Sequence, residues 1–405
     1  MFPFTRPSNK TAQWLSLVFF YTTVGLAFGF VSFWIYINRL MLTLPPPEDP
    51  KPVVYQETQP VQRVSPLLVQ YRLDLPGRGE LFPALATASA ASDYWPLAIL
   101  TITNTSKQPI VQVISGEVPE WSRRFQQSVV VGPQETAALK VNPELLPSAY
   151  GNAEIAHARL NLAVTDESGS TMFAQSRPVL IHSGSDLYWG KQFSNAQLIS
   201  RWVTPHDPAV LQLVSDAHRF VPNGRMPGYN MVNGNKAALA QQVTRQADAV
   251  VKALQRSGFN YVSSIYTFGG FTNTAQRIRL PRETLSLDSA NCMDISVAFA
   301  SAIENLGMKP VVVIVPGHAF TGVRLGPDSS EILYLDLTVL PKGTLKQAQQ
   351  RAAAWLKKTP AEQVLTVDIA SARRMGVYPL PTPGSANVAQ ESSASPARSR
   401  AAVAP

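Results

Sequence analysis

Residues 291–338, NCMDISVAFASAIENLGMKPVVVIVPGHAFTGVRLGPDSSEILYLDLT, decide the fold of the C-terminal half of the chain. The first part predicts a helix that begins at Cys292, because Asn291 is a residue type that caps helix N-termini. Gly307 is typical of the position just after a helix. Apolar residues recur at helical spacing and give this helix one buried face: Ile295, Phe299, Ala302, Ile303 and Leu306.

The start of a helix is an unusual place for the only cysteine of the chain, Cys292. Unpaired N–H groups and the positive end of the helix dipole favour a thiolate there. The same N–H groups can stabilise an oxyanion. A lone cysteine is also found as a small buried apolar side chain, so the position alone leaves both interpretations open.

The rest of the stretch predicts three strands, at 310–315, 318–325 and 331–338. The last two form a hairpin. If Leu325 pairs with Glu331, Asp336 is the same-face diagonal neighbour of His318; a loop shorter by two residues puts Asp336 directly opposite. In both registers the imidazole and the carboxylate lie on one face, whereas a slip of one residue separates them.

Cys292, His318 and Asp336 are the residue types that nucleophilic catalysis requires. A thiol attacks a carbonyl carbon, an imidazole takes and returns the proton, and a carboxylate fixes the imidazole tautomer. Each also has an ordinary structural interpretation: a buried cysteine, a strand histidine and an aspartate near a turn. Their joint placement on a helix start and a hairpin favours the catalytic one.

Four sequence segments resemble those of the transglutaminase-like superfamily of papain-type folds: QRIRLPRETL (276–285), NCMD (291–294), GMKPVVVIVPGHAFTGV (307–323) and YLDLT (334–338). The resemblance covers about residues 200–340, and the bacterial envelope members, which often hydrolyse amide bonds, are the most similar. It implies Cys292 as nucleophile, His318 as base and Asp336 as orienting acid, with Thr338 beside it. It also implies an oxyanion hole from the Cys292 N–H and a side-chain donor, for which Gln276 is the candidate; Asp294 is expected to make structural hydrogen bonds.

The N-terminal part of the chain contains an uncharged apolar segment, WLSLVFFYTTVGLAFGFVSFWIYI, at residues 14–37. It is long enough to cross a bilayer, and no small-residue cleavage site follows it, so we expect a retained transmembrane signal anchor. Basic residues mildly favour a cytoplasmic N-terminus, residues 1–13. The proline-rich residues 38–66 then predict an extended linker.

Residues 67–185 predict an all-β immunoglobulin-like sandwich, with seven strands of alternating or apolar residues separated by turn clusters. We expect His157 and His182 to be packing residues there. The strands are expected at 67–73, 97–104, 110–115, 128–132, 137–141, 157–166 and 172–182.

Residues 186–380 predict the α+β papain-like domain. Besides the elements above, the spacing of apolar residues predicts helices over 208–221 and 236–257, a strand over 259–268 and an edge strand over 364–369. Residues 344–358 predict a solvated helix. The Pro-, Ala- and Ser-rich tail, residues 381–405, predicts disorder.

Composition excludes several other classes of protein. The 405 residues carry a net charge of +8, but the basic residues are scattered, which disfavours nucleic acid as a partner. One cysteine allows neither an intramolecular disulfide nor a cysteine-based zinc site. No calcium loop of the DxDxDG kind is present, and we expect no metal and no cofactor.

The sequence therefore predicts a thiol enzyme of acyl-transfer type in the bacterial inner membrane. It has a single span, its C-terminal domains are periplasmic, and its substrate is a protein or peptide of the cell envelope. Cleavage of an amide by water is preferred over cross-linking by an amine. The alternative is a catalytically silent transglutaminase-like scaffold or binding protein; the oligomeric state stays open.

Overall fold

The computed structural model describes residues 61–64, 66–76, 79–86, 96–230, 235–258, 260–262, 267–268, 275–287, 289–340 and 342–381. The predicted anchor at 14–37, most of the predicted linker and all but the first residue of the predicted tail lie outside these ranges. Among the helices of the described ranges, none combines the length and the apolar composition that crossing a bilayer requires.

The N-terminal part of the described chain consists of two β-sheets. All seven predicted strands are present, and residues 62–64, which the linker was expected to include, form an additional strand that pairs with β2. One sheet has the order β1 (Gln62–Val64), β2 (Leu67–Leu73), β4 (Ala98–Asn104) and β7 (Thr136–Val141). The other has the order β3 (Glu80–Leu81), β9 (Thr171–Ile181), β8 (Ala156–Asp166), β5 (Ile110–Glu117) and β6 (Phe125–Val131).

Alternation of buried residues explains why these strands pair as they do. In β2 and β4 every second side chain is buried, and in β8 Leu160, Leu162 and Val164 follow the same period of two. Side chains from both sheets meet in one apolar cluster. The seven strands match the expectation of an all-β domain, while its immunoglobulin-like assignment stays a prediction. Of two short helices, α3 (Pro147–Tyr150) buries Ala149 in this cluster, whereas α2 (Pro83–Ala86) buries Ala84 and Leu85 in the cluster that contains Cys292.

The C-terminal part is built on an antiparallel four-stranded sheet. Its order is β17 (Ile332–Leu335), β16 (His318–Arg324), β15 (Pro310–Val315) and β18 (Leu365–Asp368). All six residues of β15 are buried, as expected for a strand covered on both faces. The predicted edge strand at 364–369 is confirmed as β18.

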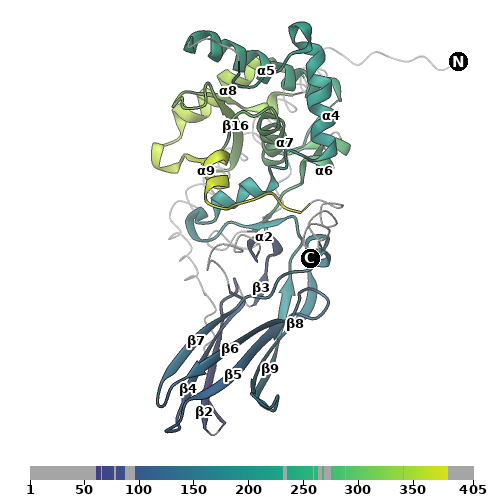
Figure 1. The fold of residues 1–405 in the computed structure, drawn as a ribbon. Coiled ribbons are helices and arrows are strands. Elements are labelled where there is room, and N and C mark those ends of the chain that lie inside the picture. Colours follow the sequence, from purple (N-terminus) through teal and green to yellow (C-terminus); the bar gives the residue numbers. More distant parts are fainter. Residues whose placement is uncertain are drawn as a thin grey trace, which may run out of the picture. The chain divides into compact units, whose positions relative to one another are not determined.

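Two helices cover this sheet, one on each face (Figure 1). Val312 and Ile314 of β15 pack in the cluster that includes residues of α7 (Cys292–Asn305). Val311, Val313 and Val315 point the other way and pack with α8 (Leu345–Lys358). Both helices begin where the sequence predicts, at Cys292 and just after Thr344.

Further helices and two small sheets complete this part. The helices are α4 (Pro208–Ala217), α5 (Lys236–Arg256), α6 (Pro281–Ser286) and α9 (Ile369–Arg374). The small sheets are β10 (Asp186–Tyr188), β13 (Ala275–Arg277) and β12 (Thr267–Phe268), in that order, and the pair β11 (Asn260–Tyr261) and β14 (Ser289–Ala290).

The single strand expected over 259–268 is wrong. β11 pairs in parallel with β14, whereas β12 pairs antiparallel with β13, so the two ends of that segment belong to different sheets. The residue types favour strand throughout, but the pairing partner changes within the segment, and composition does not report a change of partner.

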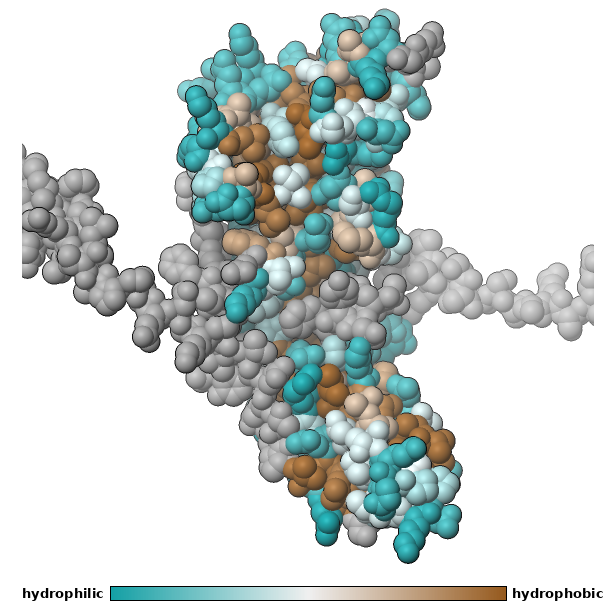
Figure 2. All heavy atoms as spheres, turned by 90° about the vertical axis from the view of Figure 1, so that its left-hand side faces the viewer, coloured by the Kyte–Doolittle hydropathy of each residue, from teal (hydrophilic) through white to brown (hydrophobic). Residues whose placement is uncertain are grey.

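The surface is mixed in character. On the face drawn in Figure 2, hydrophobic side chains lie interspersed with hydrophilic ones. Large apolar side chains that are exposed come from many elements of the described chain rather than from one, among them Val130, Ile155, Leu211, Leu287, Met375 and Tyr378.

Candidate active site

The first turn of α7 is fixed by a reciprocal capping box. Oδ1 of Asn291 accepts hydrogen bonds from the backbone N–H groups of Met293 and Asp294, both at 2.9 Å. The Asp294 carboxylate accepts in return from the Asn291 N–H at 3.5 Å and from the Arg279 N–H at 3.0 Å. Asp294 therefore has the structural role that the sequence predicts, and burial raises the pKa of its carboxyl group. Cys292 is held at the helix start, 6% exposed.

The hairpin adopts the first of the two registers that place the imidazole and carboxylate on one face. Thr321 lies opposite Leu335, and the Leu325 N–H donates to the Glu331 carbonyl at 2.9 Å. β17 is shorter than expected, because it ends at Leu335 and Asp336 caps a 3-10 turn over Leu337–Val339. The chain thus leaves the sheet at the candidate carboxylate.

His318 and Asp336 are joined by a hydrogen bond of 2.9 Å between Nε2 and Oδ2. The Asp336 side chain is completely buried, and the other oxygen, Oδ1, accepts from the hydroxyl of Thr338 at 2.6 Å and from its N–H at 3.1 Å. Both carboxylate oxygens therefore have donors, as a buried charge requires.

Electrostatics favour an imidazolium at His318. Burial by itself lowers the pKa of His318, but hydrogen bonds to Asp336 and to the Cys292 side chain, together with their charges, outweigh it and raise the pKa to about 9. Burial opposes ionisation of Asp336 as well, yet its bonds to His318 and Thr338 hold the pKa of that carboxyl group below its ordinary value. The pKa of His318 is raised and that of Asp336 is lowered, and both shifts favour the ion pair between them.

The structure thus brings Cys292, His318 and Asp336 together, with His318 between the other two. Because Nε2 is engaged by Asp336, Nδ1 is the ring nitrogen available to the Cys292 thiol. An arrangement of thiol, imidazole and carboxylate in this order can move a proton from sulfur to nitrogen and stabilise the resulting ion pair.

Gln276 lies on β13, where its amide oxygen accepts a hydrogen bond from the indole N–H of Trp189 at 3.1 Å. Trp189 and Cys292 pack in the same apolar cluster. Since the oxygen of the amide is engaged, its NH₂ group is the end left to donate. A donor is what an oxyanion hole requires, and the role of Gln276 stays a prediction.

The sequence predicts a solvated helix at α8, and it gives no role at the site to three residues of this helix. Arg351 Nε lies 3.2 Å from Asp336 Oδ2, and the Trp355 ring stacks on the His318 ring with centroids 4.5 Å apart. Lys358 Nζ lies 3.2 Å from the centroid of Trp355. The sequence does contain a signal for this packing: Ala348, Ala352 and Trp355 are spaced by four and three residues, so they lie on one face of the helix and could pack against the sheet.

His182 is more than the packing residue that the sequence predicts. It is 4% exposed, stacks on Phe82 with centroids 3.9 Å apart, and forms ion pairs with Asp186 at 3.5 Å and Glu80 at 3.6 Å. Burial lowers the pKa of His182, but the two carboxylates together raise it. Asp186 in turn binds Arg277 at 3.0 Å, which ties β10 to β13 next to Gln276.

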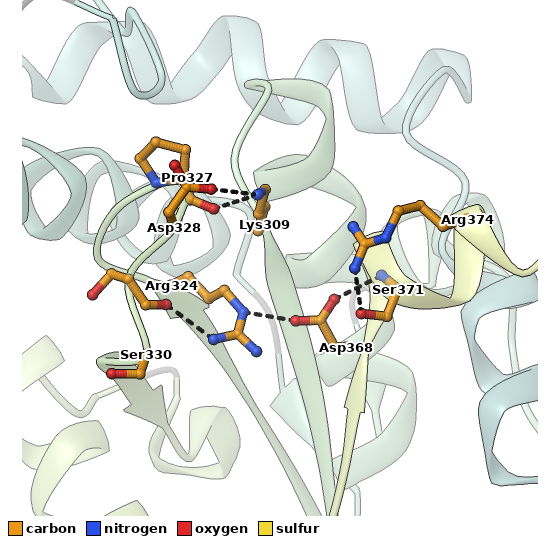
Figure 3. Close-up of a pocket in the computed structure, with 9 residues that line it drawn as sticks. Lys309, Arg324, Pro327, Asp328, Ser330, Asp368, Ser371 and Arg374 are labelled. Atoms are coloured by element: carbon orange, nitrogen blue, oxygen red, sulfur yellow. Dashed lines mark hydrogen bonds and ion pairs between the residues drawn. The ribbon is translucent and has the colours of Figure 1, made fainter.

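A separate cavity of about 290 Å³ lies at the other end of β16 (Figure 3). Arg324, which ends β16, donates to Asp368 at 2.7 Å and to the Ser329 carbonyl at 3.0 Å. At ~3.3 Å per residue, the seven-residue strand places Arg324 about 20 Å from His318. None of Cys292, His318 and Asp336 lines this cavity, so its ion pairs belong to the framework of the sheet.

Comparison with known proteins adds little to this geometry. No protein-family model and no curated protein matches the chain. The chain is similar to a solved structure of a FixG-related protein from Vibrio parahaemolyticus, at 16% identity over 29% of this chain and 96% of that one, with a TM-score of 0.17. It is also similar to an X-ray structure of the Northeast Structural Genomics Consortium target SoR45, at 10% identity over 31% of this chain and 80% of that one, with a TM-score of 0.13. At these TM-scores neither similarity supports an inference about fold or function.

Proposed function

We propose that this chain is a thiol enzyme of acyl-transfer type with Cys292 as its nucleophile, His318 as its base and Asp336 as the acid that orients His318. The observation that carries the proposal is the position of the His318 ring, which is bound to buried Asp336 at 2.9 Å on one nitrogen and lies close enough to Cys292 for the thiol to help raise the pKa of the imidazole. The resemblance to transglutaminase-like proteins of the papain type supports the same three roles.

The reaction starts from the ion pair in which the proton of the Cys292 thiol is held on His318, whose raised pKa favours the imidazolium. The sulfur then attacks the carbonyl carbon of an amide, with the developing oxyanion facing the Cys292 N–H and the Gln276 amide. As the C–N bond breaks, His318 gives its proton to the leaving amine and a thioester remains on Cys292. Water then attacks the thioester with His318 as base, the S–C bond breaks, and the proton returns to sulfur.

Asp336 stays ionised throughout. It stabilises the imidazolium in each proton-transfer step and fixes the proton on Nε2, so that Nδ1 faces the sulfur. No metal or cofactor takes part in this scheme.

We further propose where the reaction takes place. Residues 14–37 anchor the chain in the bacterial inner membrane, and residues 38–60 lead to an immunoglobulin-like domain and the catalytic domain on the periplasmic side. The substrates are then proteins or peptides of the cell envelope. Hydrolysis is preferred to cross-linking.

One observation favours a second candidate, a catalytically silent scaffold. Cys292 is only 6% exposed and the His318 side chain 8%, so a substrate carbonyl has little open surface to approach. A scaffold would keep the same three side chains as a hydrogen-bonded part of its core.

Alkylation of the full-length chain with iodoacetamide separates the two candidates. An ion-paired thiolate reacts at pH 7 about tenfold faster than free glutathione. His318→Gln abolishes this advantage, whereas His157→Gln, at an exposed position of β8, retains it. A thioester-trapping probe followed by mass spectrometry then locates the acyl group on Cys292. A rate no faster than that of glutathione, with no trapped thioester, establishes the scaffold instead.

A further inference from the structure

Helix α8 contacts both His318, the candidate base, and Asp336, the carboxylate that orients it. Trp355 stacks on the His318 imidazole with ring centroids 4.5 Å apart and an angle of 18° between the planes. One turn earlier, Arg351 Nε lies 3.2 Å from Oδ2 of Asp336, the same oxygen that binds His318. The helix therefore touches the imidazole with one side chain and the carboxylate with another.

The backbone of α8 is attached at the same place. The Asp336 N–H donates to the Ala348 carbonyl at 3.1 Å, and Ala348 and Ala352 are completely buried. Small side chains let the helix approach the sheet closely, and the residues that follow at spacings of three and four project along the same face. Arg351 and Trp355 are therefore aimed by a helix that is itself fixed to Asp336.

The two contacts have distinct physical effects. A nearly parallel indole restricts the His318 ring to one plane and keeps water from one of its faces. Lys358, whose Nζ lies 3.2 Å from the Trp355 centroid, adds a further contact to the indole. Arg351 supports the charge of Asp336, but as a second cation on the same oxygen it opposes the imidazolium.

We propose that Arg351 and Trp355 are positioning residues of the site. Trp355 holds the ring of His318 in the plane that faces Cys292. Arg351 holds the carboxylate of Asp336 and, by pairing with the same oxygen as His318, lowers the proton affinity of the imidazole. This inference rests on the proposed function. Neither residue touches the substrate in this scheme: Trp355 acts through His318, and Arg351 acts through Asp336.

The test for Trp355 is the iodoacetamide rate of Cys292 in the full-length chain at pH 7. Trp355→Ala lowers this rate about tenfold, because small displacements of a reacting group lower rates steeply. Trp355→Phe, which keeps a stacked ring, stays within about threefold of the unchanged chain. Leu356→Ala is the matched control, since it removes packing from the next residue of α8, which packs against the β15 cluster as Trp355 does.

Thermal unfolding of each variant separates positioning from stability. The proposal expects Leu356→Ala to lower the melting temperature without lowering the alkylation rate. It expects a folded Trp355→Ala chain to react slowly. A folded Trp355→Ala chain that alkylates at the unchanged rate overturns the role of Trp355.

The test for Arg351 is the titration midpoint of His318, followed by NMR with labelled histidine and assigned with His318→Gln. Arg351→Gln removes a cation from Asp336 and moves the midpoint upward. Lys357→Gln, the matched control, removes the same charge from an exposed position of α8 and leaves the midpoint in place. Equal shifts in both variants, or none in either, overturn the role of Arg351.

These results are distinguishable from failure of the proposed function. An unchanged chain that alkylates no faster than glutathione contradicts the enzyme, while the NMR midpoint still tests whether Arg351 acts on His318 through Asp336. A fast-reacting Cys292 that is indifferent to Trp355→Ala, with a His318 midpoint that is indifferent to Arg351→Gln, contradicts the positioning roles alone.

Discussion

Thr338 donates its hydroxyl to Asp336 at 2.6 Å and leaves the opposite carboxylate oxygen to His318. Thr338→Val keeps the shape of the side chain and removes the donor, so a buried carboxylate oxygen loses one of its two hydrogen bonds from this residue. We expect a loss of about 1–2 kcal/mol in the free energy of unfolding, and a several-fold slower alkylation of Cys292. Thr338→Ser, which keeps the hydroxyl, should restore the rate; a rate in Thr338→Val equal to that of the unchanged chain would contradict the prediction.

The raised pKa of His318 predicts a pH-dependent stability. The pKa moves from 6.5 to about 9 on folding, so the folded chain binds more protons between these values than the unfolded chain does. The contribution is fully present below pH 6.5 and is lost as the pH rises through 9. The loss is on the order of 3 kcal/mol. Urea unfolding at several pH values measures it, and the difference between the unchanged chain and His318→Gln should shrink over that interval.

The capping box of α7 predicts that Asn291 matters for reactivity as well as for stability. Asn291→Ala removes the acceptor for two N–H groups of the first turn and lowers the free energy of unfolding by about 1 kcal/mol. The same change loosens the turn that carries Cys292, so we expect slower alkylation. Asn235→Ala removes the equivalent cap of α5, where Asn235 accepts from the Ala238 N–H at 3.1 Å. This control should lose similar stability and keep the rate.

The candidate oxyanion donor is tested by changing one group of its side chain. Gln276→Glu preserves an oxygen acceptor for Trp189 and removes the NH₂ donor. We expect thioester formation on Cys292 to slow by about a hundredfold, as for other single oxyanion donors. Trp189→Phe removes the contact that orients the amide and should slow the reaction less. Unaltered thioester formation in Gln276→Glu would exclude this residue from the oxyanion hole.

Much of the C-terminal sheet could be predicted because its signals are local. Asn291 and Gly307 mark the ends of α7, and Thr344 marks the start of α8, since caps are satisfied within one turn of the helix. The loop near Leu325 and Glu331 leaves two registers open, both of which place His318 and Asp336 on one face, and the structure has the one that pairs Leu325 with Glu331. These features need no knowledge of distant residues.

The parts that could not be predicted depend on which surfaces meet. Arg351 and Trp355 lie on a helix whose composition is polar, and only its packing on the sheet brings them to Asp336 and His318. The segment 259–268 has strand propensity along its length, yet its two ends pair with β14 and β13. The ion pairs of His182 likewise join β3 and β10, which are far apart in the sequence.

The partial exposure of Arg351 has a consequence for the medium in which the site works. Its side chain is 53% exposed while Asp336, its partner, is fully buried. Dissolved electrolyte reaches the guanidinium and screens it, whereas the carboxylate and the imidazole are shielded. Rising ionic strength should therefore weaken the ion pair between Arg351 and Oδ2 of Asp336 and strengthen the one between His318 and the same oxygen. The proton affinity of His318 then increases with the salinity of the surrounding fluid.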